Sequence, residues 1–355
     1  MKITLLNKFQ EELNHIRDYL KHIEYVNNVI GYSGLENDSD EIKILLKTLK
    51  EHSKFFRIAR KRFEYKATII SLYGLLEKYI EAWIKEYLDS LSRLVPNYNL
   101  IDEKIRENHF ELSLKLINTM TTRESAKYQH ITKEEVLNNL NSCIVSPNNY
   151  RINAEAFVLS SGNLKHAKIS DLFKNLNIDL NAKLLDNKSL NNQIGLSKEK
   201  NAQTEKDVLY EKINDLVERR NEIAHGAENI DNLLDISELK AYIDFLEVYG
   251  KAIFEGLREE LIKQESVHTF QKIEKVIKIF NNQILAFEIE SYRIHIGDTI
   301  IIQTPEGKFD KKQILDIQLD GKSYPALQIS EKKKIAVRLE AKIKENQTFY
   351  IKKIG

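Results

Sequence analysis

The spacing of apolar residues changes once along this 355-residue chain, near residue 268. Before that point apolar side chains recur every three or four residues, which is typical of amphipathic helices. After it, Ile- and Val-rich runs are separated by NN, PEG and DG, which is typical of short antiparallel strands. The pattern predicts a mainly α protein, in which a helical bundle is followed by a small antiparallel β-barrel.

Long helices are possible because the chain contains only 4 prolines and 12 glycines. The clearest helical patterns cover about residues 5–30, 65–91, 205–224 and 235–261. At the start of the last one, Asp235 and Glu238 have the spacing of a capping box. In its apolar stripe Gly250 would let a neighbouring helix approach closely.

The weaker patterns at residues 96–205 predict an insertion of short helices, and the Asn- and Lys-rich tract at 186–205 predicts an exposed loop. We therefore expect two domains. The first is helical and covers residues 1–264, and the second is the β domain at residues 268–355.

Composition excludes several kinds of protein. The net charge is +1, so no overall field draws the chain to nucleic acid or to a membrane. The single cysteine, Cys143, excludes an internal disulfide framework and a thiolate metal cluster within one chain. No apolar run approaches the roughly 18 residues that span a bilayer. The N-terminal sequence becomes polar too early for a signal peptide, so we expect a cytoplasmic protein without membrane contact.

The helix predicted at residues 205–224 carries an arginine among its apolar residues. At about 100° per residue, Arg220 falls in the middle of the apolar arc, whereas Arg219 points to solvent. The apolar members of this arc are Ile213, Leu216, Val217, Ile223 and Ala224. Arginine stays protonated, so a buried one must meet a carboxylate, a phosphate or a wet groove. A structural pair with a glutamate is the simplest interpretation of this position. Asn221 and His225 lie on one flank, one turn apart, and Gly226 can end the helix.

The segment Arg220-Asn221-Glu222-Ile223-Ala224-His225 matches the R-x(4–6)-H signature of HEPN domains, including the polar residue that commonly follows the arginine. Its position before a long final helix resembles the HEPN nucleases of prokaryotic toxin and defence systems. The resemblance covers about residues 5–264.

This resemblance implies a metal-independent endoribonuclease without a cofactor, acting as a homodimer in which the two motifs face each other. It also implies that the substrate is RNA, such as tRNA or mRNA, and that an antitoxin or a defence protein is a possible partner. The residue types suit the chemistry. The imidazole of His225 can serve as base or acid, and Arg220 offers a planar fork to phosphoryl oxygens. Asn221 can orient the phosphate or the imidazole.

Glu77 is a second polar residue in an apolar stripe, because it continues the series Ile70, Tyr73, Glu77, Ile80 of the helix at residues 65–91. We expect it to pair with Arg220 or to tune His225. A purely structural ion pair is an equally good interpretation.

A group of cations offers a possible contact for the RNA backbone. Lys54, Arg57 and Lys61 share one helical face, and Arg219 would add a charge near the motif. A solvated basic face is the more common explanation of such a pattern.

The last 80 or so residues are similar to the small barrels of translation-factor second domains and of the C-terminus of some collagenase-like peptidases. Two other functions therefore stay open beside the ribonuclease. One is a catalytically silent HEPN scaffold that binds RNA or a nucleotide. The other is a translation-associated RNA-binding protein in which the barrel carries the main function.

Overall fold

The computed structural model describes residues 1–32, 39–122, 126–159, 163–195, 202–226 and 232–353. Its helices are α1 Ile3–Gly31, α2 Asp40–Leu94, α3 Glu103–Thr122, α4 Lys133–Val145, α5 Ala154–Phe157, α6 His166–Lys174, α7 Leu180–Leu185, α8 Lys188–Gln193, α9 Ala202–Ala224 and α10 Ile236–His268. Two short 3-10 helices cover Tyr98–Leu100 and Ala126–Tyr128.

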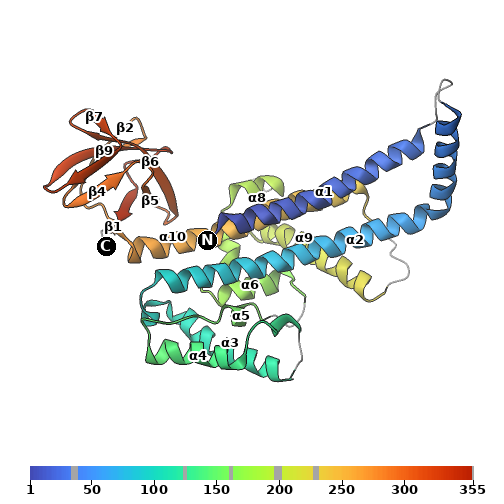
Figure 1. Cartoon of the computed structure of the whole chain (residues 1–355), viewed down its shortest axis with the longest axis horizontal. Helices are drawn as coiled ribbons and strands as arrows, with labels where there is room; N and C mark the ends of the chain where they lie inside the picture. The colour runs from blue at the N-terminus through green and yellow to red at the C-terminus, as the bar shows by residue number, and fades with distance from the viewer. Residues whose placement is uncertain (33–38, 123–125, 160–162, 196–201, 227–231, 354–355) are drawn as a thin grey trace.

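The helical part is built on three long helices, α1, α2 and α10, which pack against one another (Figure 1). An aromatic cluster joins them: the ring of Phe9 on α1 lies 5.1 Å from that of Trp83 on α2, which in turn lies 5.9 Å from that of Phe254 on α10. All three side chains are fully buried, so this cluster forms the centre of the main core.

The 55-residue helix α2 is longer than the helical pattern at residues 65–91 and extends it mainly toward the N-terminus. It starts at Ser39, whose side chain accepts a hydrogen bond from the backbone N–H of Ile42, and acidic residues fill its first turn. It ends at Leu94, directly before Val95-Pro96, because the residue before a proline avoids the helical conformation. Ile70 is 49% exposed and not part of the inner face, so this predicted position is wrong. The buried face instead passes through Ile69, Leu72 and Leu76.

Helix α10 confirms the expected start and the expected close contact. Asp235 accepts from the backbone N–H of Glu238 while the Glu238 carboxylate accepts from the backbone N–H of Asp235, which completes the capping box. Gly250 lies against the rings of Phe9 and Trp83, and a side chain there would collide with Phe9.

The short helices α3 to α8 fill the predicted insertion. Helix α5 packs on α2, α7 and α8 pack on α10, and α3 packs on α5 (Figure 1). Helices α3, α4 and α5 share a small core of their own around Leu116, Tyr128 and Val136. The exposed loop expected at 186–205 is wrong for residues 188–193, which form α8, because Leu190 is buried in the main core and holds this turn in place.

The strands follow directly on α10. They are β1 Phe270–Lys272, β2 Val276–Phe280, β3 Ile284–Ile289, β4 Tyr292–His295, β5 Thr299–Gln303, β6 Phe309–Leu319, β7 Lys322–Tyr324, β8 Ala326–Ile329, β9 Lys333–Leu339 and β10 Thr348–Lys352. The main antiparallel sheet has the order β1-β10-β5-β6-β9-β3-β2, with β7 paired to β6, and β4 pairs with β8. The sheet curls around its own apolar core, so the β-rich part is a half-barrel.

The helical and β parts touch where α10 runs into β1. Ile262, Phe270 and Ile301 form a small shared cluster, and Lys311 on β6 forms an ion pair with Glu265 on α10. Because α10 continues to His268, the predicted helical range 1–264 ends inside this helix. No helix in the described part of the chain has both the length and the apolar character needed to cross a bilayer.

We predict opposite effects of two glycine substitutions in long helices. Gly250→Ala should destabilise the protein, by about 1–3 kcal/mol, because the added methyl group must displace Phe9 in the packed core. Gly74→Ala on α2 meets no atom within 4 Å and should stabilise by about 0.5–1 kcal/mol, because alanine has the better helix propensity. Thermal and urea unfolding measure both values. A Gly250→Ala protein as stable as wild type would contradict the close approach of Phe9 to Gly250.

Candidate active site

Helix α9 carries the Arg220–His225 segment and packs on α2 (Figure 1). Ile213, Leu216 and Val217 are fully buried, as the helical wheel predicts, and Ile223 packs against the same core. Ala224 is exposed because it is the last residue of α9, so its predicted place on the buried face is wrong. Gly226 has φ of +73°, the left-handed conformation in which glycine commonly ends a helix, so the predicted end is also confirmed.

Arg219 faces the protein interior, so its predicted orientation toward solvent is wrong. Its side chain is 13% exposed. Its Nε donates to Asp215 at 2.7 Å, and its Nη1 donates to the hydroxyl of Tyr65 at 3.0 Å and to the carbonyl of Asn232 at 2.9 Å. Tyr242 on α10 donates to the same Asp215 carboxylate. The reason is that α9 packs against more than one neighbour, so the residue beside its apolar arc is enclosed as well.

These contacts also act on the charge of Arg219. Burial by itself would lower the pKa of the guanidinium, but the hydrogen bonds to Tyr65 and Asp215 outweigh burial and raise the pKa. Because the network ties α9 to α2 and α10, these contacts give Arg219 a structural role. Its role as an RNA contact stays a prediction.

Arg220 lies on the next face of α9, over the ring of Tyr73 on α2. Its guanidinium carbon is 4.2 Å from the ring centroid, a cation–π contact. Its Nη1 donates to Asn163 Oδ1 at 2.8 Å and to Asn221 Oδ1 at 3.2 Å. Both bonds leave from one nitrogen, so Nε and Nη2 have no hydrogen-bond partner among the residues that the structure describes. The side chain is half-buried, and this geometry can present a fixed fork to an anion.

His225 follows the last helical residue of α9 and is exposed. Its backbone N–H donates to the carbonyl of Asn221 at 2.9 Å, so the two residues are one turn apart, as predicted. The imidazole forms no hydrogen bond or ring contact within the described part of the chain. It is therefore open to a substrate or to another chain.

Glu77 lies close to Arg220 but does not form an ion pair with it in the described contacts. Burial raises the pKa of its carboxyl group, and the neighbouring Glu81 raises it further, whereas Lys127 and Arg220 lower it less. Lys127 forms its ion pair with Glu81 instead, at 2.5 Å. The structure thus brings Glu77 near the arginine as a carboxyl group that holds its proton more tightly than usual.

The basic residues of α2 are not part of this arrangement. Lys54, Arg57 and Lys61 are exposed. From Lys61 to Tyr73 the helix rises about 18 Å, and Arg57 is turned about 160° from Tyr73 around the axis. Their role as RNA contacts stays a prediction that no contact tests.

Two residues of the site were missed by sequence reasoning. Tyr73 was expected only as an apolar side chain of α2, and its position under Arg220 depends on how α2 and α9 pack. Asn163 lies in the loop before α6 and carries no sequence signal for this contact. The described residues contain no group of three or more His, Cys, Asp or Glu side chains arranged to hold a metal ion.

Comparison with known proteins gives one family. A family model described as RiboL-PSP-HEPN matches residues 33–259, more than half of the chain. No curated protein matches the sequence. Among solved structures, a flavohemoglobin from Malassezia yamatoensis, with bound FAD and heme, is similar at 10% identity and a TM-score of 0.17. That match covers 82% of this chain and 63% of the flavohemoglobin, and it carries no argument about fold or function.

We expect Arg219→Lys to destabilise the protein by about 1–3 kcal/mol, because an ammonium group cannot replace three hydrogen bonds that leave from a planar fork. Thermal unfolding with circular dichroism measures the loss. Arg93→Lys is the matched control, because the Arg93 side chain is 62% exposed and should be replaceable without effect. An equally stable Arg219→Lys protein would show that the network does not tie α9 to its neighbours.

We predict that Glu77→Gln raises the melting temperature at pH 7, by about 1–3 °C. A carboxyl group whose folded pKa is raised favours the folded state while it is protonated. That contribution to stability is complete below the ordinary pKa of 4.5 and is lost as pH rises through the pKa of the folded state. At neutral pH the wild-type protein is therefore less stable than a variant with a neutral side chain at this position. The difference should disappear near pH 3.5. Melting curves across this pH range test the prediction, with the exposed Glu111→Gln as control.

Proposed function

We propose that this chain, which belongs to the RiboL-PSP-HEPN family, is a metal-independent endoribonuclease. One observation carries the proposal. Arg220 is held on the ring of Tyr73 by bonds from a single nitrogen, with two nitrogens left for a ligand, and the exposed His225 follows at the spacing of the family motif.

The proposed reaction uses the RNA itself as the nucleophile. The 2′-hydroxyl oxygen attacks the adjacent phosphorus, the bond from phosphorus to the 5′-oxygen breaks, and the products are a 2′,3′-cyclic phosphate and a 5′-hydroxyl. A base takes the proton of the 2′-hydroxyl, and an acid gives a proton to the leaving oxygen. His225 can perform either step, and the free N–H groups of Arg220 stabilise the charge that develops on the phosphoryl oxygens.

The neighbouring residues have supporting roles in this proposal. Asn221 accepts a hydrogen bond from Arg220, so it holds the guanidinium in place and does not need to contact the phosphate. Glu77 adds a carboxyl group with a raised pKa near the guanidinium, which either tunes the charge of the site or moves a proton.

A homodimer would supply both an acid and a base from one short motif. An apolar stripe on α2 supports this arrangement. Phe56, Phe63 and Ile70 are seven residues apart, so they lie on one face, and they are 43%, 67% and 49% exposed. Ile70 is one helical turn from Tyr73, the residue whose ring Arg220 covers. A second copy that covers this stripe would bring its own Arg220 and His225 toward Arg220 and His225 of the first copy.

We further propose that the substrate is cellular RNA, such as tRNA or mRNA, and that the setting is a toxin–antitoxin or antiviral defence system. Both statements rest on the resemblance of the motif to HEPN nucleases. The first alternative is a catalytically silent HEPN scaffold that binds RNA or a nucleotide. The second, a translation-associated RNA-binding protein, rests on the half-barrel alone. A cleavage assay separates these functions.

We expect His225→Ala and Arg220→Ala each to reduce RNA cleavage about a hundredfold or more, because one removes the proton-transfer group and the other a phosphate contact. Purified protein with total RNA, followed by sequencing of RNA ends, measures the loss. His15→Ala, an exposed histidine on α1, is the matched control. Cleavage should continue in EDTA and leave cyclic phosphate ends. Equal cleavage by wild type and His225→Ala would rule out the proposed site, and no cleavage by wild type would favour the silent scaffold.

We expect Phe63→Arg to separate the dimer, because it places a charge in the centre of the apolar stripe. Light scattering after size-exclusion chromatography measures the mass. Phe55→Arg is the control, since Phe55 is 88% exposed but points about 100° away from Phe56 on the helix. A wild-type monomer that still cuts RNA would rule out the proposed arrangement.

A further inference from the structure

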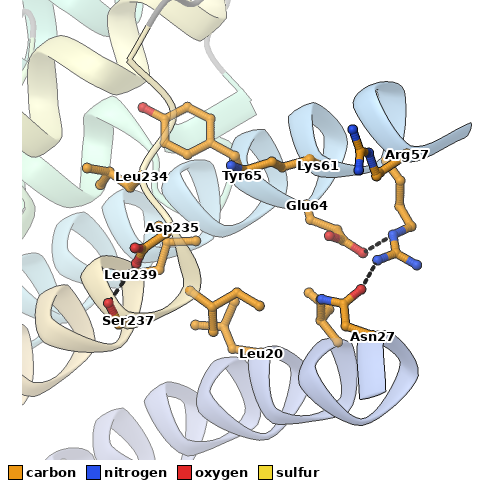
Figure 2. A pocket seen from close by; sticks show the side chains of 13 residues that line it. Leu20, Asn27, Arg57, Lys61, Glu64, Tyr65, Leu234, Asp235, Ser237 and Leu239 are labelled. Atoms are coloured by element: carbon orange, nitrogen blue, oxygen red, sulfur yellow. Dashed lines mark hydrogen bonds and ion pairs between the residues drawn. The ribbon is translucent and has the colours of Figure 1, made fainter. Parts of the chain in front are cut away.

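A cavity of about 530 Å³ lies between α1, α2 and the start of α10. Figure 2 shows the side chains that line it, among them Leu20, Tyr65, Leu234 and Leu239. Its volume is in the range of pockets that hold small organic ligands. The Arg220 site does not include it, because none of Arg220, Asn221 and His225 lines this pocket.

The floor of this pocket is apolar. Leu20, Ile23 and Leu239 belong to the main core, and Leu234 closes the side next to α10. Tyr65 contributes its ring but is 1% exposed, and its hydroxyl is held by Arg219. These side chains are already buried, so an occupant would make van der Waals contact with their carbon atoms but would remove little apolar surface from water.

The rim of the pocket carries two exposed cations, and the charge of one of them, Lys61, helps to lower the pKa of the Asp235 carboxyl group on the same rim. Arg57 and Lys61 are one turn apart on α2, both are exposed, and neither forms a hydrogen bond or an ion pair among the residues that the structure describes. Figure 2 shows both on α2, across the pocket from Leu20. Two neighbouring cations at the edge of an apolar cavity fit a ligand with one anionic end.

The other polar groups around the pocket are already paired. Arg60 lies 3.2 Å from the Glu64 carboxylate and also donates to Asn27. Asp235 accepts from the backbone N–H of Glu238 at 2.9 Å and from the hydroxyl of Ser237 at 2.7 Å. These bonds hold the pKa of Asp235 below its ordinary value, and its carboxylate serves as the N-cap of α10.

We propose that this pocket binds a small amphipathic anion, with its apolar body on the floor and its anionic group between Arg57 and Lys61. An RNA strand satisfies the two cations equally well but leaves the apolar floor against a polar backbone. A neutral apolar molecule covers the floor but leaves the cations unused. The combination of both features selects the amphipathic anion.

Isothermal titration of the full-length protein with decanoate, below its micelle concentration, tests the proposal. We expect one binding site per chain. The double variant Arg57→Gln/Lys61→Gln should bind decanoate about tenfold more weakly or worse, because it loses both charge-assisted contacts. Lys47→Gln is the matched control: Lys47 is an exposed cation on the same helix outside the pocket, so its loss should leave binding unchanged.

The choice of probe separates the two halves of the ligand. Butanoate keeps the charge and decan-1-ol keeps most of the apolar body, and each should bind at least about tenfold more weakly than decanoate. Monodecyl phosphate shows whether a phosphate or a carboxylate is the better anionic end. Melting curves check that all variants are folded.

Two results would overturn the proposal. The first is the absence of saturable decanoate binding, and the second is equal binding by wild type and the double variant. If decanoate does not bind and the double variant also loses single-stranded RNA binding, Arg57 and Lys61 belong to an RNA path. None of these measurements uses RNA cleavage, so they are independent of the proposed ribonuclease activity.

Discussion

The hydrogen-bond network of Arg219 determines how α9 sits in this protein. A guanidinium that is 13% exposed cannot be neutralised and must be satisfied where it lies. Asp215, Tyr65 and the carbonyl of Asn232 supply the acceptors from α9 itself, from α2 and from the segment before α10. Because all three bonds must form together, they fix both the rotation and the height of α9 against its neighbours.

The candidate active site follows from that fixed rotation. Arg220 is the next residue, so its side chain leaves α9 about 100° further around the axis and meets Tyr73. The same network contributes to the pocket between α1, α2 and α10, since Tyr65 lines it and Leu234 follows two residues after Asn232. Arg219 thus positions both Tyr65 in the wall of the pocket and helix α9, which carries Arg220 and His225.

Helical periodicity predicted most of the long elements, and its errors have a common cause. The stripe Ile213, Leu216 and Val217 is buried as expected, but a wheel with one apolar side assumes a single neighbour. Helix α9 contacts several elements, so Arg219 is enclosed although it lies outside the arc. On α2 the same assumption placed Ile70 inside, whereas Ile69 and Leu72 face the core and Ile70 is left on the surface.

The sequence by itself determined features that depend on near neighbours in the chain. These are the change from helical to strand periodicity near residue 268, the capping box of α10 and the motif spacing from Arg220 to His225. The close approach at Gly250 could also be expected, because a missing side chain has few other uses inside an apolar stripe.

Only the tertiary structure decided which distant groups meet. Three features depend on segments that are far apart in the sequence. They are the contacts of Arg220 with Tyr73 and Asn163, the raised pKa of Glu77, and the cations beside an apolar pocket floor. Periodicity states which face of a helix is apolar. The electrostatic and packing energies of a site depend on what stands opposite that face, which only the folded arrangement supplies.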